Sequence, residues 1–198
     1  MEVRMLDDKG LDLIFRKARS QNGWVEGAVS DDMLKALYEL WKWGPTSANC
    51  SPARVLFIRS QAGKERLRPH LMPANVEKTM TAPVCAIIGY HRKFYQRIPE
   101  LFPHNPQAQD WFSNNETLAN ETAFRNSSLQ GAYLLIAARA MGLDAGPMSG
   151  FDADAVEAEF FPSGDIKVNF ICALGKGDDT KLFDRHPRLA FDEACQLL

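Results

Sequence analysis

The sequence lacks the features that mark secretion, membrane insertion and nucleic-acid binding. Its first ten residues, MEVRMLDDKG, are rich in charge and contain no apolar stretch, so we expect no signal peptide. The longest uncharged apolar run, residues 126–138, is too short to cross a bilayer as a helix. The net charge is −2 and no block of Lys and Arg stands out, which argues against nucleic-acid binding as the main activity.

The cysteines, histidines and glycines form none of the spacings that mark disulfide frameworks, metal sites or nucleotide-binding loops. The four cysteines are far apart and form no CxxC pair, so neither a disulfide framework nor a zinc site is expected, and a reducing cytoplasm is favoured. The four histidines form no HxxxH or HExxH pair, so no metal site is predicted. The absence of GxxxxGK[ST], and of GxGxxG after a strand, leaves no support for a Walker or Rossmann nucleotide site.

The remaining composition is that of one ordinary globular domain. The chain has 198 residues, of which 45% are hydrophobic and 24% are charged, enough for a sizeable core. No internal repeat or linker divides it, so residues 1–198 are predicted to form a single domain.

Four segments have helical patterns. Residues 11–18 and 63–71 are predicted to form short helices. A clearer helix begins after Ser30, which can cap it, and ends before Gly44 and Pro45; Leu34, Leu37, Tyr38 and Trp41 give it one apolar face. The longest predicted helix covers residues 117–141. Its second half is apolar almost all round, which suits a core helix and a subunit interface equally well.

Three short apolar runs are predicted to be strands: residues 54–60, 83–90 and 166–175. They are almost continuously apolar, so we expect both faces of the sheet to be covered. Strands separated by helices predict a layered α+β or α/β fold. Residues 91–116 contain three prolines and five aromatic residues, and they favour a lid or a packed surface insertion about equally.

The segment KWGPTSANCSPAR, residues 42–54, contains Cys50 between a predicted helix and a predicted strand. A cysteine nucleophile needs a nearby base and an orienting group, and no local signature supplies either. A structural thiol is the favoured interpretation, and a cysteine hydrolase stays an alternative. A hydrolase would be colourless and would lose its activity on Cys50→Ala.

Weak polar signals recur along the chain in a definite order: Arg19–Ser20, the Pro45–Asn49 turn, Asn75 with Lys78, the GPMSGFD turn, and Arg188. Together with NGW, GKERLRP, TAPV, LFPH, ETAFRNSS, KLF and PRL, they make the chain resemble the FMN-dependent nitroreductase family over nearly its whole length. The resemblance points to the malonic semialdehyde reductase branch linked to pyrimidine utilisation, the Rut-type reductases. It implies a nitroreductase-like fold with a central mixed sheet flanked by helices, and a long hydrophobic helix at a dimer interface.

The resemblance also implies the parts of a flavin site that two subunits of a homodimer share. Arg19, Ser20 and Arg188 would bind the FMN phosphate, and Pro45, Thr46, Ser47 and Asn49 would contact the flavin of the partner subunit. Asn75 would match the polar edge of the flavin ring, and Lys78 would stabilise charge that grows there on reduction. The turn Pro147, Met148, Ser149 and Gly150 would approach flavin N5. Four positions depart from the family pattern: Ala18, Ala53, Ser149 and His186.

The implied reaction is ping-pong hydride transfer from NADH or NADPH, through FMN, to malonic semialdehyde, giving 3-hydroxypropionate. The flavin carries the hydride, so the catalytic side chains stay unassigned, with Lys78 tuning the cofactor. A general nitro or quinone reductase is the alternative within this class. A flavin-binding module without turnover is the alternative of another class.

Overall fold

The computed structural model describes residues 5–198, so the first four residues of the stretch that predicts no signal peptide lie outside it. Within these residues, four strands form one sheet in the order β1-β2-β4-β3. The strands are β1 (Ala53–Ile58), β2 (Val84–His91), β3 (Asp144–Met148) and β4 (Ile166–Gly175). The three predicted strands correspond to β1, β2 and β4.

The direction of the strands corrects one expectation. All three ladders of the sheet are antiparallel, whereas a mixed sheet was expected. The one parallel pairing among residues 5–198 is an isolated bridge between Ser20 and Ala145. An almost continuous apolar run reports that both faces of a strand are covered, and it does not report the direction of the neighbouring strands.

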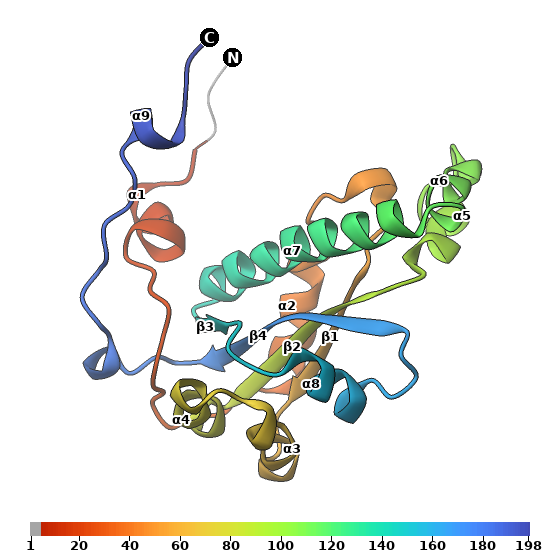
Figure 1. Ribbon diagram of the computed structural model, residues 1–198. Coiled ribbons are helices and arrows are strands. Elements are labelled where there is room, and N and C mark those ends of the chain that lie inside the picture. Colours follow the sequence, from red (N-terminus) through yellow and green to blue (C-terminus); the bar gives the residue numbers. More distant parts are fainter. Residues whose placement is uncertain (1–4) are drawn as a thin grey trace.

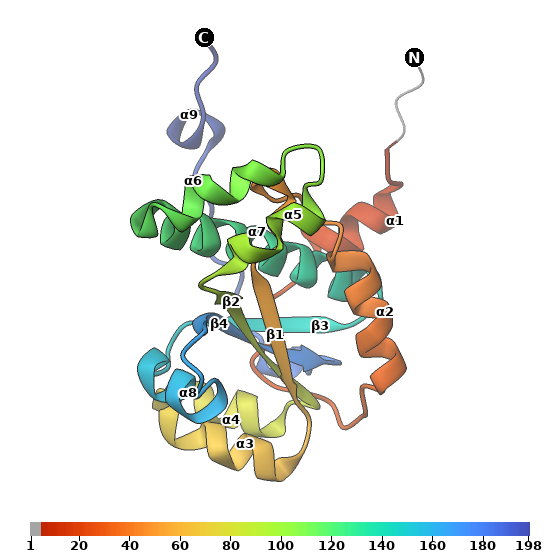
Figure 2. The same cartoon turned by 90° about the vertical axis from the view of Figure 1, so that its right-hand side faces the viewer.

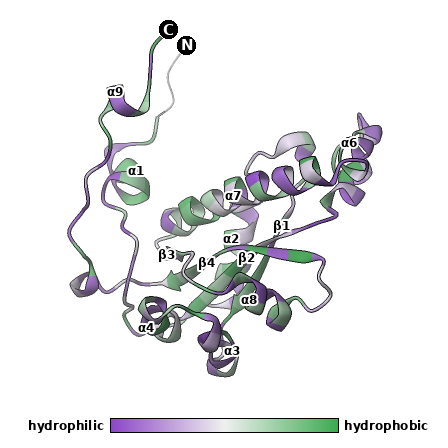
Figure 3. Cartoon of the chain, viewed as in Figure 1, coloured by the Kyte–Doolittle hydropathy of each residue, from purple (hydrophilic) through white to green (hydrophobic). Residues whose placement is uncertain are grey.

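Helices cover both faces of the sheet, which confirms the layered α+β fold (Figures 1 and 2). On one face lie α2 (Asp31–Trp41) and α7 (Glu116–Ala140), packed on Val84, Ala86 and Ile88 of β2. On the other face α3 (Gln61–Leu67), α4 (Pro73–Thr81) and α8 (Ala153–Phe160) lie near Cys85 and Ile87. Figure 3 shows the hydrophobic residues concentrated in the strands between these layers.

Helix α2 has the predicted cap and ends before Gly44. The Oγ atom of Ser30 accepts a hydrogen bond from the backbone N–H of Met33 at 3.1 Å, which satisfies a free donor of the first turn. Leu34, Leu37 and Trp41 are buried as predicted. Tyr38 is 48% exposed, so the apolar face is narrower than its spacing suggested.

Helix α7 extends to within one residue of the predicted bounds at each end. Its buried side presents small and polar residues to the sheet, including Asn126, Ser127 and Gly131. The large apolar side chains of the helix that face outward are Leu118, Phe124, Leu129 and Tyr133, and they are 37–53% exposed. The helix therefore contributes to the core and leaves a second apolar face uncovered in the single chain.

Strand β3 was missed, because GPMSG was interpreted as a tight turn. Gly146, Pro147 and Met148 belong to the strand and pair with β4, and only Ser149 and Gly150 form the turn. Proline has no N–H to donate to a ladder and is tolerated on an edge strand, which is where β3 lies.

Residues 91–116 form a packed helical unit rather than an irregular excursion. It contains α5 (Ile98–Leu101), α6 (Asp110–Ser113) and two short 3₁₀ turns, Phe94–Arg97 and Pro106–Gln109. Phe94, Ile98 and Phe112 are buried together with Ala119 and Ala123 of α7. The unit has its own small core, and its role as a lid stays a prediction.

Two segments from near the ends of the chain meet at one end of α7, where Arg19 donates to the carbonyl oxygen of Phe183 and Arg185 donates to that of Ala18. Beyond these contacts the segments separate, and α1 and α9 lie apart in Figure 2. The amino-terminal helix α1 (Asp8–Leu11) continues as a π-helical turn to Arg16, where residues 11–18 were predicted to be helical. Residues 183–198, which include α9 (Phe191–Ala194), are all exposed. Among the helices described, none has the length and hydrophobicity needed to span a membrane.

Candidate functional site

Four arginines meet in one pocket where the two chain ends lie against the carboxyl end of α7. The pocket has a volume of about 450 Å³, and its basic residues are Arg19, Arg139, Arg185, His186 and Arg188. We call it the arginine pocket. Ser20 also lines it, so three of the residues predicted to bind phosphate, Arg19, Ser20 and Arg188, are brought together.

The guanidinium groups of this pocket have no acidic partner among the residues described. Arg19 donates to the carbonyl oxygen of Phe183 at 2.5 Å, and Arg185 donates to that of Ala18 at 3.0 Å. Arg188 donates only to its neighbours His186 and Pro187. None of the four arginines lies within 4.0 Å of a carboxylate in residues 5–198. Asp184 also lines the pocket, and four guanidinium groups against this one carboxylate leave an excess of positive charge that suits an anion.

Arg139 gives the strongest indication that the pocket binds an anion. Its Nε atom is buried and makes no hydrogen bond within residues 5–198, and its Nη1 atom donates to the carbonyl oxygen of Ile14 at 3.3 Å. Burial lowers the pKa of Arg139 from its usual value. Sequence reasoning did not select Arg139 or Arg185. One feature of the sequence could have pointed to Arg139. It is a single charge inside the apolar run AYLLIAARAMG, and such a charge needs a partner that the helix itself does not provide.

A second group of predicted residues meets at the other end of β3. The Nδ2 atom of Asn75 donates to the carbonyl oxygen of Gly150 at 2.8 Å, and the backbone N–H of Met72 donates to the same oxygen at 3.0 Å. A Cβ atom on Gly150 would lie 2.5 Å from Asn75 Nδ2, so only glycine permits this approach. Asn75 and the turn that follows β3 are therefore held as one unit.

Lys78 lies one turn further along α4 than Asn75. Its side chain is half-buried and forms no ion pair in the described part of the chain, and burial lowers its pKa from the usual value. The carbonyl oxygen of Lys78 accepts a hydrogen bond from the indole of Trp24 at 2.7 Å, which fixes this turn of the helix. An unpaired, partly desolvated cation can stabilise negative charge brought next to it.

Strand β3 connects these two groups. Ser20 bridges to Ala145, near the start of the strand, and the Gly150 turn follows Met148 at its end. Three residues of extended chain between Ala145 and Met148 span roughly 10 Å. Within residues 5–198, the chain therefore carries a cluster of cations near one end of β3, and an amide with a lysine that forms no ion pair near the other end.

The Pro45–Asn49 loop lies elsewhere in the same chain. The backbone N–H of Ser47 donates to Oδ1 of Asn126 at 2.9 Å, in the first half of α7, whereas Arg139 lies in its last turn. Thirteen helical residues separate the two contacts, a distance of about 20 Å. One chain thus does not bring this loop, which was predicted to contact the flavin of the partner subunit, to its own arginine pocket.

The loop itself is strained and firmly held. Ala48, Asn49 and Ser51 have φ values of 49°, 47° and 38°, a region that residues with a side chain rarely adopt. Thr46 Oγ1 accepts a hydrogen bond from the N–H of Ser51 at 3.1 Å, and Asn49 Nδ2 donates to the carbonyl oxygen of Leu101 in α5 at 2.7 Å. Asn49 therefore links the loop to the helical unit of residues 91–116.

Cys50 is enclosed by that same unit. Its side chain is 1% exposed and packs with Phe94 and Ile98, and burial raises the pKa of the thiol to about 12. A protonated, shielded thiol is a poor nucleophile. The structure therefore gives the cysteine-hydrolase alternative no support.

Comparison with known proteins shows the family to which the chain belongs. The family model described as the nitroreductase family matches residues 25–176. A protein of Cupriavidus pinatubonensis, named as an NADH dehydrogenase/NAD(P)H nitroreductase, is 59% identical over 189 residues, which are 94% of this chain and 96% of the relative.

Two crystal structures show the same fold. One is a nitroreductase from Exiguobacterium sibiricum in complex with FMN, with a TM-score of 0.87 at 19% identity and coverage of 100% of both chains. The other is a nitroreductase from Bacillus subtilis, with a TM-score of 0.84 at 21% identity, covering 93% of this chain and 97% of that one.

Proposed function

The chain belongs to the nitroreductase family, and on that premise we propose that it is an FMN-dependent oxidoreductase that takes its electrons from NADH or NADPH. The observation that carries this proposal is the pair of groups joined by β3: the arginine pocket at one end and the Asn75–Gly150 unit with Lys78 at the other. The relative named as an NAD(P)H nitroreductase and the solved structure that contains FMN support the choice of both cofactors.

The residues present fit FMN. Within residues 5–198 the arginine pocket offers guanidinium groups without acidic partners, and one of them, on Arg139, has a buried N–H that makes no hydrogen bond there. Arg19, Ser20, Arg139 and Arg188 would hold the phosphate. Asn75 and the backbone of Pro147, Met148, Ser149 and Gly150 would hold the flavin ring, and Lys78 would place a positive charge beside it. Bound FMN would supply the hydride chemistry that none of these side chains can perform.

This chain's own residues would orient the cofactor and tune its charge. The Asn75–Gly150 hydrogen bond keeps the amide in one rotamer, so its remaining polar atoms have a fixed direction. Partial burial of Lys78 weakens the screening of its charge by water. No side chain acts as a nucleophile in this scheme.

For the second substrate we propose malonic semialdehyde, with 3-hydroxypropionate as the product and a role in pyrimidine degradation in the cytoplasm. Resemblance to the Rut-type branch supports this choice. A general nitro or quinone reductase fits the family membership equally well.

Anaerobic titration and substrate rates test these assignments. Purified protein is expected to be yellow, to bleach on anaerobic addition of NADH or NADPH, and to reduce malonic semialdehyde with a higher kcat/KM than a quinone or a nitroaromatic. Bound flavin that neither nucleotide bleaches would favour a binding module without turnover. A semialdehyde rate no higher than background would leave the general reductase as the function.

We further propose that the chain functions as a homodimer, with the Pro45–Asn49 loop completing the flavin site of the partner. The loop lies about 20 Å from the arginine pocket of its own chain along α7. Gly44, the residue before the loop, packs against the ring of Tyr133, so the loop adjoins the exposed apolar face of α7. Exposed apolar patches of this kind commonly mark protein interfaces.

An aspartate in that face should separate the subunits. Phe124 is 53% exposed on α7, and burying a carboxylate there in a dimer is costly, so Phe124→Asp is expected to convert a dimer into a monomer that loses FMN. Light scattering coupled to gel filtration would report the mass against the 22.2 kDa of one chain. Val25→Asp, at a 45% exposed site remote from α7, is the control. A wild-type monomer with full FMN occupancy would contradict the shared site.

A further inference from the structure

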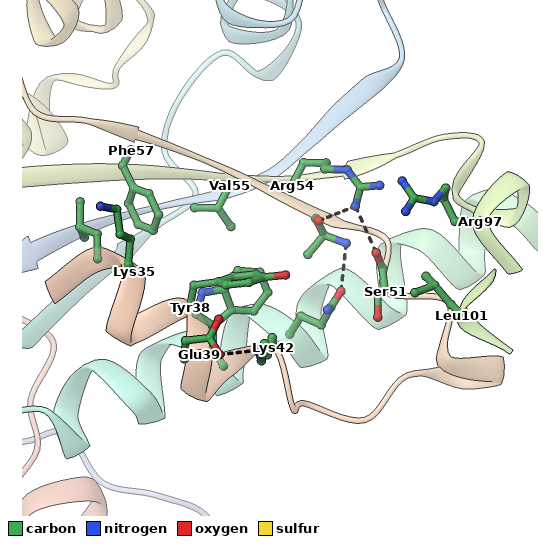
Figure 4. A pocket seen from close by; sticks show the side chains of 14 residues that line it. Lys35, Tyr38, Glu39, Lys42, Ser51, Arg54, Val55, Phe57, Arg97 and Leu101 are labelled. Carbon is green, nitrogen blue, oxygen red and sulfur yellow. Dashed lines mark hydrogen bonds and ion pairs between the residues drawn. The ribbon is translucent and has the colours of Figure 1, made fainter. Parts of the chain in front are cut away.

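A cavity with a volume of about 830 Å³ lies between α2 and the edge strand β1, outside the groups already assigned. Ser51, at the end of the strained loop, and Arg97 and Leu101, from the helical unit of residues 91–116, line one end of it (Figure 4). The cavity therefore adjoins the loop that we place at the flavin of the partner subunit.

Arg54 is the cation of this cavity that has no acidic partner in residues 5–198. Lys35 pairs with Asp32, Lys42 with Glu39 and Arg97 with Glu100. The Nη1 atom of Arg54 instead donates to the backbone carbonyl oxygens of Ser51 at 3.2 Å, Pro52 at 3.4 Å and Ala53 at 2.8 Å. These bonds fix the guanidinium without neutralising its charge.

Two guanidinium groups approach each other across this end of the cavity. Figure 4 shows Arg54 and Arg97 directed toward one another beside Ser51. Burial and the charge of Arg97 both lower the pKa of Arg54, so the two cations repel each other. An anion between them would relieve that repulsion and accept hydrogen bonds from both.

The cavity wall contains a further unmatched donor. Trp41 is 5% exposed, and its indole Nε1–H makes no hydrogen bond in the described part of the chain. Gln130 is also buried in the wall, and its Oε1 atom is occupied by the backbone N–H of Ala53 at 2.9 Å. Buried donors are normally satisfied, so an orphaned N–H in a cavity wall indicates a ligand with acceptor oxygens.

We propose that this cavity binds the carboxylate group of the substrate, with Arg54 as its main partner and Arg97 as a second cation. The inference rests on the proposed function, and it narrows the substrate class to short aldehydes that carry a carboxylate. Arg125 is an alternative arginine for this role. It lies exposed on α7, where it lines a shallow site with Phe124 and Leu129, whereas Arg54 lines the same cavity as the unsatisfied Trp41 N–H.

Two aldehydes that differ in the carboxylate group test the site. Malonic semialdehyde carries a carboxylate where propanal has a methyl group. Arg54→Gln should lower the ratio of kcat/KM for malonic semialdehyde to kcat/KM for propanal by about 10- to 100-fold, mainly through KM, as expected for loss of a hydrogen bond to a charged group. Arg54→Lys should recover part of the ratio, and Arg125→Gln should leave it at the wild-type value. Flavin absorbance and melting temperature show that each variant is folded and loaded.

Inhibition by malonate separates failure of the site from failure of the proposed substrate. With a quinone as acceptor, malonate should inhibit the wild-type enzyme competitively, and Arg54→Gln should raise its inhibition constant by a similar factor. If the wild-type enzyme does not prefer the semialdehyde to propanal, the substrate assignment fails and malonate alone decides the site. Equal malonate inhibition of wild type and Arg54→Gln, or an effect of Arg54→Gln confined to subunit association, would overturn the proposal.

Discussion

Replacing Arg139 with glutamine is expected to raise the dissociation constant for FMN by about 10- to 100-fold. A hydrogen bond to a charged group contributes about 1.5–3 kcal/mol, and each 1.4 kcal/mol is a tenfold change in affinity. Arg139 is partly desolvated, and its buried Nε–H has no partner in residues 5–198. Its interaction with a phosphate should therefore exceed that of Arg188, which is exposed and bonded only to its own neighbours. Arg188→Ala should shift the constant in the same direction by less.

Titration of apoprotein with FMN, followed by quenching of flavin fluorescence, measures this constant. Arg66→Gln is the matched control, because Arg66 is an exposed arginine that pairs with Glu159 at 2.6 Å, far from the pocket along the chain. An unchanged constant for Arg139→Gln, in a variant that melts at the wild-type temperature, would remove Arg139 from the phosphate site. If Arg139→Gln weakened FMN binding at low salt but not at high salt, Arg139 would act on FMN from a distance and not by direct contact. Salt screens distant charges more than a direct contact.

The parts of this fold that sequence could predict are those determined by neighbouring residues. Helix α7, strand β4 and the Ser30 cap follow from apolar spacing and from side chains that bond to their own backbone within one turn. Strand β3 was missed because its neighbouring residues do not determine it. Gly146 and Pro147 are turn residues by local preference, and only pairing with β4 on one side, and a free edge on the other, makes them a strand.

The candidate site shows the same division. Residues with a motif, such as Asn75, Lys78 and Gly150, could be selected from sequence because their spacing matches a family pattern. Arg139 and Arg185 carry no motif. They become site residues because the two chain ends fold back along the last turn of α7, and that approach depends on tertiary contacts such as Arg185 to Ala18. The sequence does not rank Arg54 above the other cations of the chain, and the unsatisfied Trp41 N–H in the wall of the same cavity is visible only in the structure.

Substitution of Lys78 by alanine is expected to slow the bleaching of bound FMN by NADH by about 100-fold, while the dissociation constant for FMN changes by less than about threefold. Removing one group that stabilises developing charge in a sheltered site typically costs 10²–10³ in rate. Lys78 has the required features: its ammonium is half-buried, it has no ion pair within residues 5–198, and Trp24 fixes its helical turn. A group that acts on charge formed during the reaction should affect the rate more than binding.

Anaerobic stopped-flow absorbance and the FMN titration measure these two quantities on the same preparation. Glu77→Gln is the control, because Glu77 is the exposed neighbour of Lys78 on α4. In the wild type the bleaching rate should fall as the pH rises through the pKa of Lys78, because the ammonium form is the active one. Burial lowers that pKa, so the fall should begin at a lower pH than for an ordinary lysine, and it should vanish in Lys78→Ala. If Lys78→Ala weakened FMN binding as much as it slowed bleaching, the lysine would be a binding residue, because its charge would then act equally before and during the reaction.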